Sequence, residues 1–231
     1  MVKLSNGIPV SLLRAVQTYG GYIFGDTLYF DNFDSTLLKW TKIDVGGAGT
    51  VALDATIAAT GTTSLKVTTG ALATNDTYAY QSFGTLPIGA SGVVRLSCLI
   101  RLGLAVNGDW AKVDFTFNDG VSTREPTIRF LCTAANTMSL QYYNSAAGWT
   151  NLAAGLALDM SVIRWYMLEF DVDLINNKYL AVSFGGIRYP LNVSTTSNAS
   201  TTNTSVVIVE VYTAAAVAKS IWIEEFMLRM I

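Results

Sequence analysis

Short segments in which apolar and polar residues alternate fill this chain from about residue 28 to its end. A period of two sends successive side chains to opposite faces of a β-strand, so one face can pack on a core while the other meets solvent. Two clear examples are "WAKVDFTF" (110–117) and "SVVIVEVYT" (205–213), which are rich in the strand-favouring residues Val, Thr and Phe. Turn sequences such as "NDG" and "GG" separate the segments, and no long amphipathic helix pattern is present. We therefore predict an all-β fold of two packed antiparallel sheets, a β-sandwich.

Two regions depart from this pattern. Residues 1–27 contain scattered Gly and Pro residues without regular alternation, which predicts an extended N-terminal arm outside the core. The alternative is a local strand that closes the chain's own sandwich. Residues 28–231 show no internal boundary and are predicted to form one domain. Within it, "STTSNASTTNTS" (194–205) is predicted to be an exposed, mobile loop because of its low complexity.

Composition excludes several classes of function. The chain has no histidine, which removes the commonest general base and the commonest metal ligand of proteins. A net charge of −2 without a basic stripe argues against nucleic-acid binding. Only 14% of the residues are charged, below the quarter or so that is usual. Such a composition favours a protein that packs against copies of itself.

Targeting and cysteine usage give further expectations. The apolar stretch near the N-terminus is interrupted by Asn6, Pro9 and Arg14, which is not typical of a signal peptide. No window reaches the roughly 20 apolar residues that span a membrane, so we expect cytoplasmic synthesis and no membrane partner. Cys98 and Cys132 lie in separate apolar segments and are predicted to be buried free thiols, with one disulfide between them as the alternative.

Three stretches carry a combined pattern of aromatic, acidic and apolar residues. They are "LYFDNFDSTLLKW" (28–40), "GTTSLKVTT" (61–69) and "SIWIEEFMLRMI" (220–231). Together they resemble the concanavalin A-like and carbohydrate-binding-module jelly rolls. The resemblance implies that the β-sandwich of residues 28–231 is a jelly roll, and it leaves the activity open because one fold hosts many functions. Jelly rolls of this kind occur in secreted carbohydrate enzymes and in bacteriophage virion proteins, such as tail, fibre and capsid-decoration subunits.

The same resemblance implies a structural calcium ion. Members of this family often hold Ca²⁺ between the first and the last strand. The matching positions in this chain are Asp31 or Asp34 with Glu224 or Glu225. Calcium takes about six to eight oxygen ligands, so backbone carbonyls would have to complete such a site. No other cofactor is implied.

The segment "EFDVD" (169–173) places three carboxylates on one face of a predicted strand: Glu169, Asp171 and Asp173. It resembles the catalytic strand of laminarinase-like glycoside hydrolases, which would make Glu169 the nucleophile and Asp171 the assisting residue. Asp173 is shorter than the expected acid–base Glu. Residues four apart on a regular strand are also about 13 Å apart at Cα, whereas a retaining mechanism needs carboxylates about 5 to 5.5 Å apart. We therefore interpret the row as the solvent face of a sheet.

Aromatic residues offer another route to sugar binding. "QYYNSAAGWTN" (141–151) places Tyr142, Tyr143 and Trp149 around a predicted loop, and Trp110 follows an "NGD" turn. Exposed aromatic rings can stack on sugar rings, whereas core packing is the alternative for each of them. These four residues are the predicted carbohydrate-binding residues.

Taken together, these features predict a non-enzymatic structural subunit of a virion or similar self-assembling particle, such as a capsid decoration, tail or fibre protein. Its predicted partners are copies of itself and other particle proteins, contacted through the N-terminal arm and the sheet surfaces, and surface glycans. We expect it on the particle surface after synthesis in the host cytoplasm. The alternative is a carbohydrate-binding or adhesion module, and a glycoside hydrolase rests on "EFDVD" alone.

Overall fold

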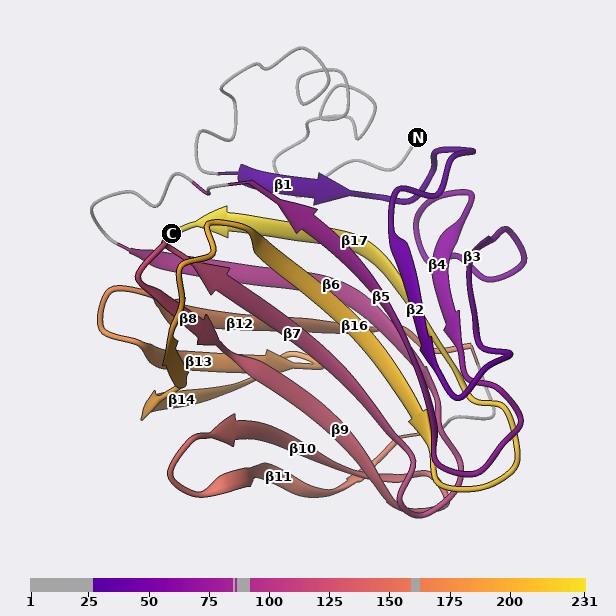
Figure 1. The fold of residues 1–231 in the computed structure, drawn as a ribbon. Helices are drawn as coiled ribbons and strands as arrows, with labels where there is room; N and C mark the ends of the chain where they lie inside the picture. Colours follow the sequence, from indigo (N-terminus) through magenta and orange to yellow (C-terminus); the bar gives the residue numbers. More distant parts are fainter. Residues whose placement is uncertain (1–26, 85, 87–91, 159–162) are drawn as a thin grey trace.

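The computed structural model describes residues 27–84, 86, 92–158 and 163–231 and arranges them as two packed β-sheets (Figure 1). The strands are β1 (Thr27–Asp31), β2 (Thr41–Val45), β3 (Thr50–Asp54), β4 (Ser64–Thr68), β5 (Asn75–Phe83), β6 (Val93–Gly103), β7 (Trp110–Asn118), β8 (Ser122–Glu125), β9 (Thr127–Ala134), β10 (Thr137–Asn144), β11 (Gly148–Ala157), β12 (Tyr166–Asp173), β13 (Lys178–Phe184), β14 (Ile187–Ser194), β15 (Thr196–Ala199), β16 (Ser205–Thr213) and β17 (Ser220–Met230). Every described strand pairing is antiparallel. The predicted antiparallel β-sandwich is therefore confirmed.

The order of strands shows how the two ends of the chain close the sandwich. The eight-stranded sheet runs β14-β13-β12-β6-β17-β4-β3, with β1 also paired to β17. The nine-stranded sheet runs β11-β10-β9-β7-β16-β5-β2, with β8 paired to β7 and β15 paired to β8. The late strands β16 and β17 thus lie between early ones, which Figure 1 shows as yellow ribbons among purple ribbons. Both sheets are complete only when the C-terminal segment has been inserted.

Alternation along the central strands decides which side chains reach the core. In β7, Val113 and Phe115 are buried between the sheets, so the intervening Lys112 and Asp114 lie on the opposite face. In β16, Val209 and its apolar neighbours at alternate positions point to the same core. We call the face of each sheet that is turned away from this core its outer face. Functional side chains of this fold have to lie there or in the connecting loops.

Several sequence predictions concern segments outside this sandwich. The predicted arm falls almost wholly on residues 1–26, which lie outside the described residues, while Thr27 already belongs to β1. The predicted loop 194–205 is partly wrong, because Thr196–Ala199 forms β15 and pairs with β8. Cys98 and Cys132 are buried free thiols, as predicted. No helix among the described residues has the length and apolar character to cross a membrane.

Candidate functional site

The predicted acidic row lies on β12, on the outer face of the eight-stranded sheet. At its centre Asp171 is only 2% exposed and is held by two arginines. Arg95 donates from Nε and Nη2 to its two carboxylate oxygens at 2.5 and 2.8 Å, and Arg188 donates from Nη2 at 2.9 Å. Burial disfavours the charge of Asp171, but the hydrogen bonds from Arg95 and Arg188 outweigh burial and lower its pKa. A carboxylate in this state is a structural anchor and a poor proton donor.

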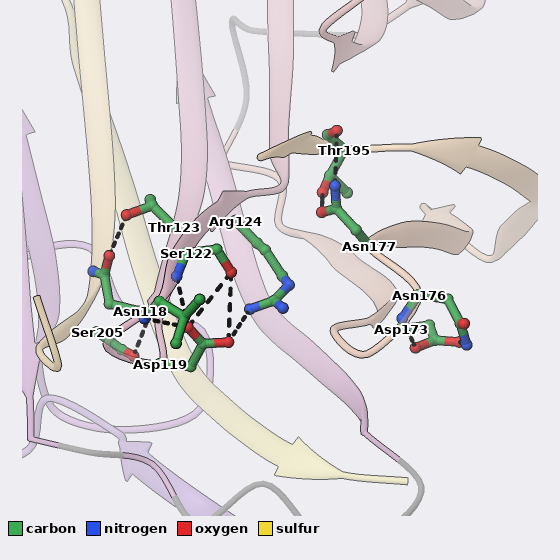
Figure 2. Close-up of polar contacts among 11 residues, drawn as sticks. Asn118, Asp119, Ser122, Thr123, Arg124, Asp173, Asn176, Asn177, Thr195 and Ser205 are labelled. Carbon is green, nitrogen blue, oxygen red and sulfur yellow. Dashed lines mark hydrogen bonds and ion pairs between the residues drawn. The ribbon is translucent and has the colours of Figure 1, made fainter. Parts of the chain in front are cut away.

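The two flanking carboxylates also have local structural roles. Asp173 accepts hydrogen bonds at 2.8 and 2.7 Å from the backbone and side-chain nitrogens of Asn176, which fix the turn between β12 and β13 (Figure 2). Glu169 lies 3.7 Å from Arg95. The row is the outer side of a sheet, as interpreted from the sequence, although Asp171 is covered by its arginines and does not face open solvent. No acid–base pair is present on β12.

The four predicted calcium ligands serve the surrounding loops. Glu224 is fully buried and accepts backbone hydrogen bonds from three successive residues of the loop 59–62. Glu225 accepts from the Thr60 hydroxyl, and Asp34 accepts from the backbone and hydroxyl of Thr62. Asp31 binds side-chain and backbone donors of its own segment. These oxygens are occupied by donors of the protein, and no cluster of three metal-ligating side chains occurs in the described ranges. The residues therefore do not fit the calcium ion that the resemblance implies.

The four predicted carbohydrate-binding residues divide between two sides of the nine-stranded sheet. Tyr142 points into the core, 7% exposed, with its ring 5.5 Å from that of Tyr179. Tyr143 and Trp149 face each other across β10 and β11 on the outer face, with ring centroids 5.2 Å apart. Trp110 lies on the same outer face of β7. The structure thus brings three of the four to one surface and leaves Tyr142 out of reach of any ligand there.

Trp110 forms part of an aromatic pair that sequence reasoning did not anticipate. Its ring stacks on that of Tyr212, the directly opposite residue of β16, with centroids 5.1 Å apart and planes 7° from parallel. Both rings are partly exposed. The outer face of the nine-stranded sheet therefore carries one aromatic pair at Trp110 and Tyr212 and another at Tyr143 and Trp149.

A charged cluster occupies the same outer face and was missed in the sequence. Lys112 on β7 lies with its Nζ 2.6 Å from Oε2 of Glu210 on β16 and 3.9 Å from Oδ2 of Asp114. Two carboxylates from neighbouring strands therefore share one ammonium group. Asp114 and Glu210 are both nearly buried, at 9% and 7% exposure, although alternation turns them away from the core. We call Asp114, Lys112 and Glu210 the shared-lysine cluster.

The electrostatics of the shared-lysine cluster differ from those of β12. Burial raises the pKa of Asp114 to about 6, and the charges of Glu125 and Glu210 add to this effect, while Lys112 and a hydrogen bond with the Thr127 side chain oppose it. Burial also raises the pKa of Glu210, which Lys112 only partly offsets. The pKa of Lys112 is raised, because attraction from the two carboxylates exceeds the cost of burial. The cluster therefore holds a carboxyl group that exchanges its proton near pH 6.

Two carboxylate oxygens of this region lack hydrogen-bond partners. Oδ1 of Asp114 is buried and accepts no hydrogen bond from any described residue, and the same is true of Oδ1 of Asp76 on the adjacent strand β5. Buried polar atoms are satisfied in the great majority of cases, so an unsatisfied one needs an explanation, of which an ordered water and a bound ligand are two. Perturbed pKa values together with unsatisfied polar atoms are characteristic of functional sites.

A signal for this cluster is present in the sequence. Glu210 is the single charged residue of "SVVIVEVYT", a segment otherwise dominated by Val, and Lys112 and Asp114 share one face of "WAKVDFTF". What the sequence could not supply is the pairing of these segments, which lie about 100 residues apart and become neighbours only through the insertion of β16.

No protein-family model matches this chain, and no curated protein matches it. Solved structures do match. An endo-β-1,4-glucuronan lyase from the fungus Trichoderma reesei aligns with 89% of this chain and 96% of its own, at a TM-score of 0.59 and 16% identity. A carbohydrate esterase, vb_24B_21, from the Shiga toxin-encoding bacteriophage phi24B aligns with 88% of this chain and 98% of its own, at a TM-score of 0.52 and 16% identity. The carbohydrate recognition domain of Emp46p, in a potassium-bound form, aligns with 87% of this chain and 95% of its own, at a TM-score of 0.53 and 10% identity.

These similarities show the fold. The chain is a concanavalin A-like jelly roll, the architecture of carbohydrate-binding proteins and glycoside hydrolases. The prediction that it is not an enzyme is contradicted, because the similar structures are mostly enzymes: the lyase and the esterase above, and β-glucanases. The prediction rested on the carboxylates of β12 and did not consider those of β7 and β16.

Proposed function

We propose that the outer face of the nine-stranded sheet binds a polysaccharide and that the shared-lysine cluster hydrolyses a glycosidic bond in it. The observation that carries this proposal is the arrangement at Lys112, where two nearly buried carboxylates from adjacent strands share one ammonium group. Asp114 is the proton donor to the leaving oxygen, because its raised pKa keeps it protonated up to about pH 6. Glu210, paired with Lys112, activates the attacking water.

The surroundings of the cluster suit a sugar polymer. Trp110 and Tyr212 form the outer-face pair next to Lys112 and Glu210 along β7 and β16. Tyr143 and Trp149 lie on β10 and β11, at the edge of the sheet. Aromatic rings offer flat apolar faces that stack on sugar rings, and the Tyr hydroxyl and Trp N–H groups can form hydrogen bonds. A sugar chain that runs obliquely over this face, from Trp110 and Tyr212 toward β10 and β11, would pass the carboxylates and contact aromatic rings at both of its ends. The glucuronan lyase and the phage carbohydrate esterase, which share the fold, act on carbohydrates by their names.

The test is the release of reducing ends from a panel of soluble polysaccharides, assayed between pH 4 and pH 8. We expect Asp114→Asn and Glu210→Gln each to lower the rate by about 10²-fold or more, as loss of a general acid or base does. The rate of the wild-type protein should fall above about pH 6, as Asp114 loses its proton. Glu169→Gln is the matched control, because Glu169 is an outer-face carboxylate of the other sheet.

Three results would contradict this proposal. The first is a rate that Asp114→Asn leaves unchanged, and the second is a Glu169→Gln variant as impaired as the Glu210→Gln variant. The third is the absence of any cleavage across the panel. Products with an unsaturated, non-reducing end would instead assign the cluster to elimination and remove the role of water.

A second proposal concerns where the protein acts. We propose that it is displayed on a virus particle or a similar assembly, together with copies of itself, and meets surface glycans there. Support comes from the low share of charged residues and from the bacteriophage origin of the esterase of the same fold. Light scattering of the purified protein tests the self-association. A defined oligomer that becomes a monomer on removal of residues 1–25 supports it, and monomers in both cases would refute it.

A further inference from the structure

On the outer face of the nine-stranded sheet, Arg129 is a cation that pairs with no anionic group of the described residues. It lies on β9, directly opposite Lys112 of β7, and it forms no ion pair with any described residue. Like charges directly opposite each other on neighbouring strands are destabilising. Lys112 is neutralised by its two carboxylates, whereas only burial acts on Arg129 and lowers its pKa to about 10. Arg129 therefore stays charged at neutral pH, and the part of the chain that the structure describes offers it no counter-ion.

A relay of side chains holds this guanidinium in one orientation. Nε and Nη2 of Arg129 donate to Oε1 of Gln141 at 2.8 and 2.6 Å. Nε2 of Gln141 in turn donates to Oδ1 of Asn151 at 2.8 Å, which fixes the direction of the amide. The guanidinium carbon lies 3.9 Å from the centre of the Trp149 ring. The Tyr143 ring packs against the Trp149 ring in an edge-to-face arrangement. The sheet thus positions Arg129 before any ligand arrives.

One edge of the guanidinium remains open. The edge made by Nε and Nη2 is taken by Gln141, while Nη1 donates to no described residue and is not among the buried nitrogens that lack a partner. Nη1 and the second hydrogen of Nη2 form the edge of the guanidinium that no described acceptor takes. Two parallel N–H groups in this arrangement match the two oxygens of a carboxylate, which is the pairing that arginine forms best.

We propose that Arg129 binds the carboxylate of an acidic sugar, so that the polysaccharide recognised by this face contains uronate residues. This inference rests on the proposed function, because it names the substrate class of the same surface. Arg129 and Glu210 are two strands apart, about 10 Å, so the uronate carboxylate is bound at a distance from the carboxylates of the cluster. The acidic group is thus taken at β9, where Arg129 supplies the positive charge.

The experiment compares binding of uronate polymers with binding of the same polymers after reduction of their carboxyl groups. Polyglucuronate, polygalacturonate and alginate, each with its carboxyl-reduced form, are titrated into the full-length protein in affinity electrophoresis. We expect Arg129→Gln to weaken binding of the preferred uronate polymer by about tenfold or more, the scale of a lost charge-assisted pair. Arg129→Lys should restore only part of this loss, because it keeps the charge without the planar edge.

Arg101 supplies the matched control. It also stacks on a tryptophan, with its guanidinium 4.1 Å from the centre of the Trp222 ring, but it lies on the eight-stranded sheet and its Nε and Nη1 are buried. Arg101→Gln should leave affinity for the uronate polymer unchanged. Equal binding of uronate and reduced polymers, or an Arg129→Gln variant with wild-type affinity, would overturn the inference while leaving polysaccharide binding standing. Binding of no polymer in either form would overturn both.

Discussion

Both sheets place a carboxylate near the middle of their outer face, and the two carboxylates have opposite environments. Asp171 on the eight-stranded sheet receives hydrogen bonds from two arginines, and its pKa is lowered. Asp114 on the nine-stranded sheet shares one lysine with Glu210, keeps an unsatisfied oxygen, and has a pKa raised to about 6. Both are nearly buried. The balance of charge around a carboxylate, and not its burial alone, therefore separates a structural anchor from a group that can transfer a proton.

The largest effect on stability is expected at Asp171. Its replacement by Ala leaves Arg95 and Arg188 without their shared partner, so we expect the free energy of unfolding at pH 7 to fall by about 3 kcal/mol. Because the pKa of Asp171 is lowered in the folded state, its contribution is present above the ordinary Asp pKa and disappears as the pH falls through the folded value. Urea denaturation at pH 7 and pH 3 measures both. A loss below 1 kcal/mol at pH 7 would show that Asp171 is not a structural anchor.

The opposite sign is expected at Asp114. Because the folded pKa of Asp114 lies above its unfolded value, the folded state holds an extra proton between about pH 4 and pH 6. That stabilisation is complete below the unfolded pKa and is lost as the pH rises through 6. Asp114→Asn should therefore raise the free energy of unfolding by about 1 to 2 kcal/mol at pH 7, with a smaller gain at pH 4. A destabilised variant at pH 7 would contradict the unbalanced environment described for this residue.

A smaller contrast is expected between two arginines. Arg95→Gln removes donors from the buried Asp171 and should lower the free energy of unfolding by about 2 kcal/mol. Arg129→Gln removes a cation that lacks an anionic partner and faces Lys112, so the change should stay within about 1 kcal/mol of zero. Thermal or urea denaturation of the two variants in parallel gives the comparison. Equal losses would mean that the contacts of Arg129 with Gln141 and Trp149 stabilise the fold as strongly as the ion pair of Arg95 does.

The smallest effect is expected at Glu169. It lies 3.7 Å from Arg95 and is partly exposed, so solvent screens the attraction. Glu169→Gln should change the free energy of unfolding by about 0.5 kcal/mol or less and leave polysaccharide cleavage at the wild-type rate. A loss above 1 kcal/mol would show that the charge network of the eight-stranded sheet extends further than Asp171 and its arginines.

The sequence was sufficient for the sandwich but not for the site, and the reason is the range of the interactions. Alternation is a local property, so segments such as 110–117 and 205–213 could be assigned to strands from their own residues. Local alternation also placed the three carboxylates of β12 on one face correctly. It could have separated Tyr142 from Tyr143, since adjacent strand residues point to opposite sides.

Chemical character, in contrast, depends on partners that are distant in the sequence. Asp171 becomes an anchor because β6 and β14 bring Arg95 and Arg188 beside it. Asp114 becomes an acid near neutral pH because burial in the assembled sandwich raises its pKa, and the charges of Glu125 and Glu210, which folding brings close, add to the rise. Neither pairing can be predicted from the residues that flank the carboxylate in the sequence. The same limit applies to Arg129, whose fixed orientation comes from Gln141 on the next strand.

The contrast between the two outer faces is tested most directly by a carbon-13 NMR titration of the aspartate carboxyl groups, with Asp114 assigned through the Asp114→Asn variant. This measurement needs no knowledge of the substrate. The predicted result is a carboxyl group at Asp114 that titrates near pH 6, while that of Asp171 titrates below the ordinary Asp range. A titration of Asp114 at or below pH 4 would contradict its role as the proton donor and, with it, the assignment of the functional site to the nine-stranded sheet.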